Sequence, residues 1–161
     1  MTASASASAS ASGWADVHER IEREVGVILF TVLAFTHGGT RMERIYSSHP
    51  DEYPVGGWKD VATEVSPEWI AITRDSATTF LAATTAEVET IFADSALIAS
   101  LGVGSILNVP LRRPDGSNWG TVNLCGAEGT YTPPQIERAE RIIAQGAPTK
   151  TDMTDPEGAS S

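Results

Sequence analysis

The stretch from residue 104 to residue 126 constrains the fold more than any other part of the chain. Two runs of mainly apolar and β-branched residues, 104–112 and 119–126, flank the segment Pro114-Asp-Gly-Ser-Asn118. Proline, Asp-Gly and asparagine are residues that tight turns favour, so the sequence predicts an antiparallel hairpin here. The apolar run 27–36, the turn 37–40 and the alternating segment 41–48 predict a second hairpin.

Helical segments flank and separate the two hairpins. Residues 14–25 are expected to form an amphipathic helix whose apolar stripe is Trp14, Val17, Ile21 and Val25. Thr132 is expected to cap a last helix that opens with two prolines and ends near Gly146. Antiparallel hairpins separated by helices favour an α+β domain over a parallel α/β sheet.

The middle of the chain is expected to be irregular. Residues 48–66 contain prolines and a Gly-Gly pair, and a long loop inside a compact domain is often functional. Short elements are expected to follow. The first is a helix capped by Ser66 with Pro67 at its first position, and a strand is expected within 78–82. A helix should then run from Thr84 to residue 92, with Glu87 completing a capping box, and another over 94–101 should be capped by Asp94.

The folded domain is expected to span residues 13–147. Residues 1–12 alternate alanine and serine, and residues 148–161 are polar and rich in helix breakers. Neither segment can bury enough apolar surface to offset the entropy of ordering it, so both are expected to be disordered.

Charge and composition exclude several classes of protein. The formal net charge is −10, which argues against a nucleic-acid partner or an anionic membrane because both need a basic face. No apolar run approaches the roughly 20 residues that a membrane-spanning helix needs. A single cysteine excludes an internal disulfide and fits a reducing cytoplasm, and three scattered histidines predict no metal site. No cofactor is expected.

The last hairpin also carries a family signature. It contains Ser105-Ile-Leu-Asn-Val-Pro-Leu111, then Asp115-Gly116, then Gly120-Thr-Val-Asn-Leu124. This resembles the pattern S-x-L-x-V-P-L, D-G, G-x-x-x-L of GAF domains. Segments 44–47, 53–57, 91–94 and 97–102 are similar to a bacterial subgroup of small stand-alone GAF proteins. The resemblance covers about residues 15–146.

The resemblance implies a GAF/PAS-like antiparallel sheet. Terminal helices would cover one face, and short helices and loops would roof a pocket on the other. GAF domains bind cyclic nucleotides, tetrapyrroles, haem, 2-oxoacids or aromatics, and the fold alone does not select among these. This chain has no cysteine in the middle segment for a covalent bilin, lacks an N-K-F-D-E-like pattern, and has too few cysteines for a free methionine sulfoxide reductase.

Family members often dimerise through their terminal helices, so the resemblance also implies a possible homodimer through residues 14–25 and 134–145. Packing of both helices on the chain's own sheet would explain the same apolar stripes.

Alternation along the last hairpin predicts which side chains face the pocket, because successive strand residues point to opposite faces. Val122 and Leu124 should face the terminal helices, together with Leu107, Val109 and Leu111. The pocket side should carry Ile106, Asn108, Thr121, Asn123 and Cys125. Asn108 and Asn123 could brace the middle loop or contact a ligand directly. Cys125 could be a small buried hydrophobe, a lining residue or a reactive nucleophile.

Aromatic residues are expected to complete the pocket. Tyr46 lies on the second strand, while Tyr53, Trp58 and Trp69 belong to the loop and the short helix expected to form the roof. They could stack on a flat ligand or simply cap the core.

These residues support three hypotheses of function. The first is a non-catalytic domain that binds or senses a small aromatic or carboxylate metabolite. The alternative is a small pocket enzyme, an isomerase, hydrolase or lyase, with Cys125 as nucleophile or acid and asparagine and tyrosine residues in support. The third is an adaptor that acts through its helical face.

Overall fold

The computed structural model describes residues 2–91 and 95–148. Within these residues the centre is a six-stranded sheet in the order β3-β2-β1-β6-β5-β4, and every pair of neighbours is antiparallel. The strands are β1 (Leu29–Thr36), β2 (Arg41–Ser47), β3 (Trp58–Asp60), β4 (Phe80–Ala82), β5 (Ser105–Arg112) and β6 (Asn118–Gly126). Both predicted hairpins are confirmed as β1–β2 and β5–β6.

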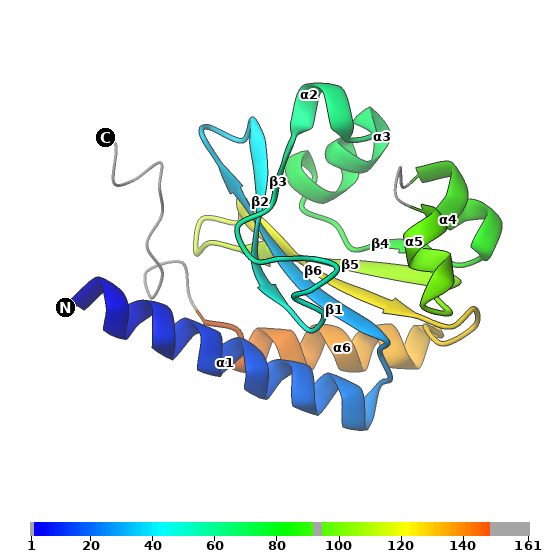
Figure 1. Cartoon of the computed structure of the whole chain (residues 1–161), viewed down its shortest axis with the longest axis horizontal. Helices are drawn as coiled ribbons and strands as arrows, with labels where there is room; N and C mark the ends of the chain where they lie inside the picture. Colours follow the sequence, from blue (N-terminus) through cyan, green and yellow to red (C-terminus); the bar gives the residue numbers. More distant parts are fainter. Residues whose placement is uncertain (1, 92–94, 149–161) are drawn as a thin grey trace.

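Helices cover the two faces of the sheet differently (Figure 1). Two long helices, α1 (Thr2–Glu24) and α6 (Pro133–Gly146), lie side by side on one face. The other face carries α2 (Val61–Glu64), α3 (Pro67–Ile70), the π-helix η1 (Ala71–Asp75), α4 (Thr85–Ile91) and α5 (Ser95–Ser100). The predicted α+β class and its layering are therefore confirmed.

The main hydrophobic core lies between α1, α6 and the sheet. The predicted helical stripe is buried, as are the strand residues expected to face it: Trp14, Val17, Ile21, Val25, Leu107, Val109, Leu111, Val122 and Leu124. The homodimer through these helices stays a prediction, because burial against the sheet accounts for their apolar residues without a second copy.

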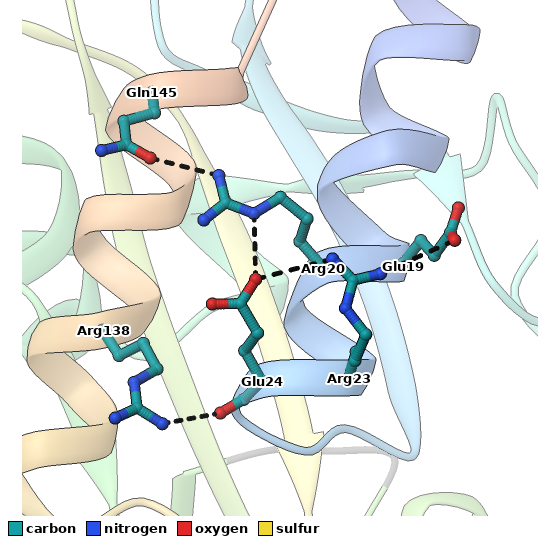
Figure 2. A network of polar contacts seen from close by, with 6 residues as sticks. All are labelled: Glu19, Arg20, Arg23, Glu24, Arg138 and Gln145. Carbon is teal, nitrogen blue, oxygen red and sulfur yellow. Dashed lines mark hydrogen bonds and ion pairs between the residues drawn. The ribbon is translucent and has the colours of Figure 1, made fainter.

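A polar network joins α1 to α6 along their solvent side (Figure 2). The Arg20 guanidinium donates from Nε to Glu24 at 3.1 Å and from a terminal nitrogen to the Gln145 side chain at 3.1 Å. Arg138 donates to the backbone carbonyl of Glu24 at 3.1 Å. Because these charges are partly exposed to water, they align the helices more than they stabilise the fold.

The N-terminal helix departs from the sequence prediction. The structure begins α1 at Thr2, whereas residues 1–12 are predicted to be disordered. Alanine has the highest helix propensity, and a helix already nucleated by the packed residues 14–24 extends at little cost. The predicted cap Asp94 and the predicted tail beyond Pro148 lie outside the described residues.

The predicted loop 48–66 is also partly regular. It contains β3, which pairs with β2, and α2, where the Asp60 carboxylate accepts hydrogen bonds from the backbone N–H groups of Ala62 and Thr63. β3 is only a three-residue edge strand, so pairing with β2 rather than local propensity defines it. None of the helices in the described parts of the chain is long and apolar enough to cross a membrane.

Candidate ligand-binding pocket

A cavity of about 90 Å³ lies between the sheet and the short helices. Strands β1, β5 and β6 supply its floor, and residues of α3, α4 and α5 together with the segments around them supply its walls and roof. Most of the lining is apolar, including Leu29, Leu33, Val65, Ile98 and Ile106. A second hydrophobic cluster surrounds one side of it, formed by residues of β1, β4, β5, β6, α4 and α5 together with Tyr53 and Val103.

The floor carries a connected set of polar side chains. The Trp69 indole Nε1 donates to Asn108 Oδ1 at 2.8 Å, and Asn108 Nδ2 donates to Asn123 Oδ1 at 2.6 Å. Asn123 Nδ2 in turn donates to Thr31 Oγ1 at 3.1 Å. Each of the four side chains is buried and each lines the cavity. We call this set, Trp69–Asn108–Asn123–Thr31, the amide relay.

Strand register brings the amide relay together. Asn108 pairs with Asn123 across β5 and β6, and Asn123 pairs with Thr31 across β6 and β1. Residues directly opposite each other in antiparallel strands point to the same face. The two asparagines and the threonine therefore form one row across three strands.

Local sequence signals place Trp69 over this row. Ser66 caps α3 by accepting a hydrogen bond from the Trp69 backbone N–H at 3.4 Å, and Pro67 occupies the first turn, both as predicted. Thr73 of η1 donates to the Trp69 carbonyl at 2.8 Å. These contacts hold the indole within reach of Asn108.

The roof is also tied to both hairpin turns. Arg74 of η1 donates to the carbonyl of Gly39, in the β1–β2 turn, at 2.9 Å. Asn118, at the start of β6, donates through Nδ2 to the carbonyl of Thr73. A π-helix is uncommon and is often found at functional sites, and here it anchors the roof of the cavity.

The structure brings five of the predicted site residues to the cavity. They are Tyr53, Trp69, Asn108, Asn123 and Cys125. The two asparagines brace the roof through Trp69 and also line the cavity, and direct contact with a ligand stays a prediction. Tyr53 is buried, and the Arg44 guanidinium carbon lies 5.2 Å from the centre of its ring.

Tyr46 does not reach the cavity, and a β-bulge explains why. The pairing of β1 with β2 shifts register between Val32 and Leu33, so that Val32 pairs with Tyr46 and Leu33 pairs with Arg44. One extra residue in a strand reverses the face of every side chain beyond it. Tyr46 consequently packs against Phe30 at a ring-centre distance of 5.7 Å, on the side of α1, and burial raises its pKa.

Trp58 and Thr121 also lie outside the lining. Trp58 on the edge strand β3 is 49% exposed, and Arg41 stacks on its ring at 3.9 Å. Thr121 is buried on the predicted face but is not part of the cavity lining, and its hydroxyl donates to Asn123 Oδ1 at 3.1 Å. Thr121 therefore supports the amide relay rather than lining the cavity.

Cys125 lies in apolar surroundings, between Leu29 and Ile106 of the neighbouring strands. The phenol of Tyr131 is close by: burial raises the pKa of Tyr131, and the charge that Cys125 would carry raises it further. Tyr131 donates to the carbonyl of Gly26 at 3.1 Å. Its burial in a hydrophobic cluster agrees with the interpretation of Cys125 as a small buried hydrophobe, and its side chain also lines the cavity. A role of Cys125 in ligand contact or as a nucleophile stays a prediction.

Sequence reasoning missed Thr31, Lys59 and Glu64, which also line the cavity. Thr31 lies in a continuous apolar run, so no alternation of polar and apolar residues marks which of its side chains face the cavity. Lys59 and Glu64 belong to the segment predicted as a loop. Among the described residues, no group of three or more histidine, cysteine, aspartate or glutamate side chains is arranged to hold a metal ion.

Comparison with known proteins rests on structure. No family model matches the sequence, and no curated protein matches it. The GAF domain of a two-component sensor histidine kinase from Bacillus halodurans superposes with a TM-score of 0.66 at 14% identity, over 84% of this chain and 89% of that one.

Two further solved structures are similar. A GAF domain/HD domain protein from Geobacter sulfurreducens has a TM-score of 0.67 at 10% identity, over 84% of this chain and 88% of the other. The second GAF domain of DevS from Mycobacterium smegmatis has a TM-score of 0.59 at 15% identity, over 85% and 89% of the two chains.

The fold and the cavity define an α+β domain built on one antiparallel sheet, with a small chamber under short helices. Its architecture is that of the GAF domains, so the chain has the GAF fold that the last hairpin predicts.

Proposed function

We propose that this chain is a sensing domain that binds a small aromatic or carboxylate metabolite in the cavity between the sheet and the short helices. The amide relay is the observation that carries the proposal. Folding buries four polar side chains around a hollow. Apolar side chains in the same positions would avoid the cost of removing these polar groups from water. Ligand pockets typically combine an apolar wall with a few convergent polar groups.

Structural neighbours support the sensing role, since one belongs to a sensor histidine kinase and another is a cyanobacteriochrome photoreceptor. The size of the cavity supports a small ligand. An enclosed apolar cavity of about 150 Å³ accepts benzene, and this one measures about 90 Å³. A ligand of a few heavy atoms fits inside, and a single ring would need part of the mouth or a small movement of the roof.

The proposal is tested by thermal unfolding with a panel of small carboxylates and monocyclic aromatics. A ligand present at about 100 times its dissociation constant stabilises the folded state by about 2.7 kcal/mol, which raises the Tm of a domain of this size by roughly 5–10 °C. At least one class of compound should give such a shift.

Two valine-to-tryptophan substitutions locate the binding site. Val65 lines the cavity from the roof, whereas Val55 is 59% exposed and lies outside the lining. We expect Val65→Trp to abolish the ligand-induced shift and Val55→Trp to keep it. Failure of every compound to shift the unmodified chain, or an equal shift in both variants, would contradict the proposal.

A further inference from the structure

The amide relay has a direction, and Trp69 sets it. An indole N–H is a donor only, whereas a side-chain amide offers an oxygen acceptor at one end and two N–H donors at the other. Because Trp69 donates to Asn108, the Asn108 oxygen must face the roof and its nitrogen must face Asn123. Asn123 must then present its oxygen to Asn108 and its nitrogen to Thr31.

Thr121 reinforces this direction. Its hydroxyl also donates to Asn123 Oδ1, so both lone pairs of that oxygen are engaged, by Asn108 and by Thr121. At the end of the relay, Thr31 Oγ1 accepts a hydrogen bond from Asn123. The hydroxyl hydrogen of Thr31 therefore points away from the Asn123 amide.

The floor consequently presents more donors than acceptors to the cavity. Besides the bonds between described residues, each asparagine nitrogen carries a second N–H, and Thr31 keeps its O–H. The charged residues that line the cavity, Lys59 and Glu64, have opposite signs, so their formal charges cancel. The polar side chains of the floor therefore discriminate between ligands.

We infer that Trp69 is the specificity-determining residue of this pocket: by fixing the direction of the amide relay, it selects ligands that bring hydrogen-bond acceptors and rejects ligands of the same shape that bring donors. The inference rests on the proposed function for the site, and it adds which side of the hydrogen bond the ligand must supply. A site that leaves buried donors unpaired loses much of its affinity, which is why matched ligands should separate clearly.

Two pairs of ligands test the selectivity by chemical-shift titration. Acetate and acetamidine are nearly identical in shape, one an acceptor and the other a donor. Pyridine and pyrrole repeat the comparison without charge. The unmodified chain should bind acetate and pyridine at least about tenfold more tightly than their partners, as expected for one or two hydrogen bonds. A preference for acetamidine and pyrrole would overturn the inference.

Two tryptophan-to-phenylalanine substitutions isolate the indole N–H. Trp69→Phe keeps an aromatic ring in the roof but removes the donor, and Trp58→Phe makes the same change at the exposed edge strand. We expect Trp69→Phe to reduce the preference to within about threefold and Trp58→Phe to retain it. Thr31→Val, on the sheet, should also weaken the preference while leaving the roof unchanged.

A ligand-free measurement separates this inference from the proposed function. The side-chain amide NMR signals of Asn108 and Asn123 should move in Trp69→Phe and stay in place in Trp58→Phe. If no compound binds the unmodified chain, the proposed function fails, and these signals still decide whether Trp69 sets the direction. Unchanged Asn108 and Asn123 signals in Trp69→Phe would overturn the inference.

Discussion

His18 shows how one side chain can link the fold to pH. Its ring stacks on Phe30 at a centre-to-centre distance of 5.1 Å, and its Nδ1 lies 3.4 Å from the Tyr46 hydroxyl. Burial lowers the pKa of His18, the nearby charge of Glu22 opposes this, and His49 lowers the pKa further. The seam between α1 and the sheet therefore favours a neutral imidazole.

This pKa shift predicts how stability depends on pH. The folded pKa lies below the unfolded value, so the unfolded chain binds more protons as the pH falls through that value. The contribution of His18 is complete above its unfolded pKa and is lost below it. We expect the free energy of unfolding to fall between about pH 7.5 and 5.5 in urea titrations, and to fall less in His18→Gln.

His37→Gln provides the matched control for this experiment, because His37 is exposed in the β1–β2 turn. This substitution removes a histidine and leaves the contacts of His18 with Phe30 and Tyr46 in place. An unchanged pH dependence in His18→Gln would show that folding does not lower the pKa of His18.

At the scale of elements, the contact between α1 and the rest of the domain combines a polar seam with an apolar one. Arg20 and Ile21 are neighbours in α1 but face different surroundings. The Arg20 side chain is 39% exposed and bonds to Glu24 and Gln145, whereas Ile21 is fully buried in the core.

Alanine substitutions at these neighbours should separate the two seams. Arg20→Ala should change the free energy of unfolding by less than about 1 kcal/mol, because partly exposed ion pairs are screened by water. Ile21→Ala should cost about 2–5 kcal/mol, since it removes buried carbon atoms and leaves a cavity. Chemical denaturation measures both changes. Equal losses would mean that the polar network in Figure 2 holds the helices together.

At the scale of the whole molecule, burial is distributed unevenly over the two faces of the sheet. Every residue of β6 is buried, and all but the last residue of β5. In contrast α2 has no buried residue, and Val88 is the one buried residue of α4. Elements with few buried contacts open with low local free energies.

Hydrogen exchange should therefore distinguish the layers. We expect backbone amides of β1, β5 and β6 to exchange slowest, and those of α2 and α4 to exchange much faster. A ligand in the cavity should protect the roof, Ser66 to Thr73 above all, while leaving the central strands little changed. Protection that rises only in α1 and α6 would place the ligand elsewhere.

The sequence by itself predicts the hairpins, the two terminal helices and the polar side of the last hairpin. These features depend on local chemistry: turn residues, helix caps, and strict alternation along β5 and β6. That alternation places Asn108, Asn123 and Cys125 on the cavity side without any knowledge of the other strands.

Only the tertiary structure decides the rest of the pocket. A single bulge in the β1–β2 pair turns Tyr46 toward α1, and pairing with β6 brings Thr31 beneath Asn123. The Trp69 indole reaches Asn108 from a residue 39 positions earlier in the chain. Contacts between distant segments depend on register and on how helices dock, and local residue patterns do not encode either one.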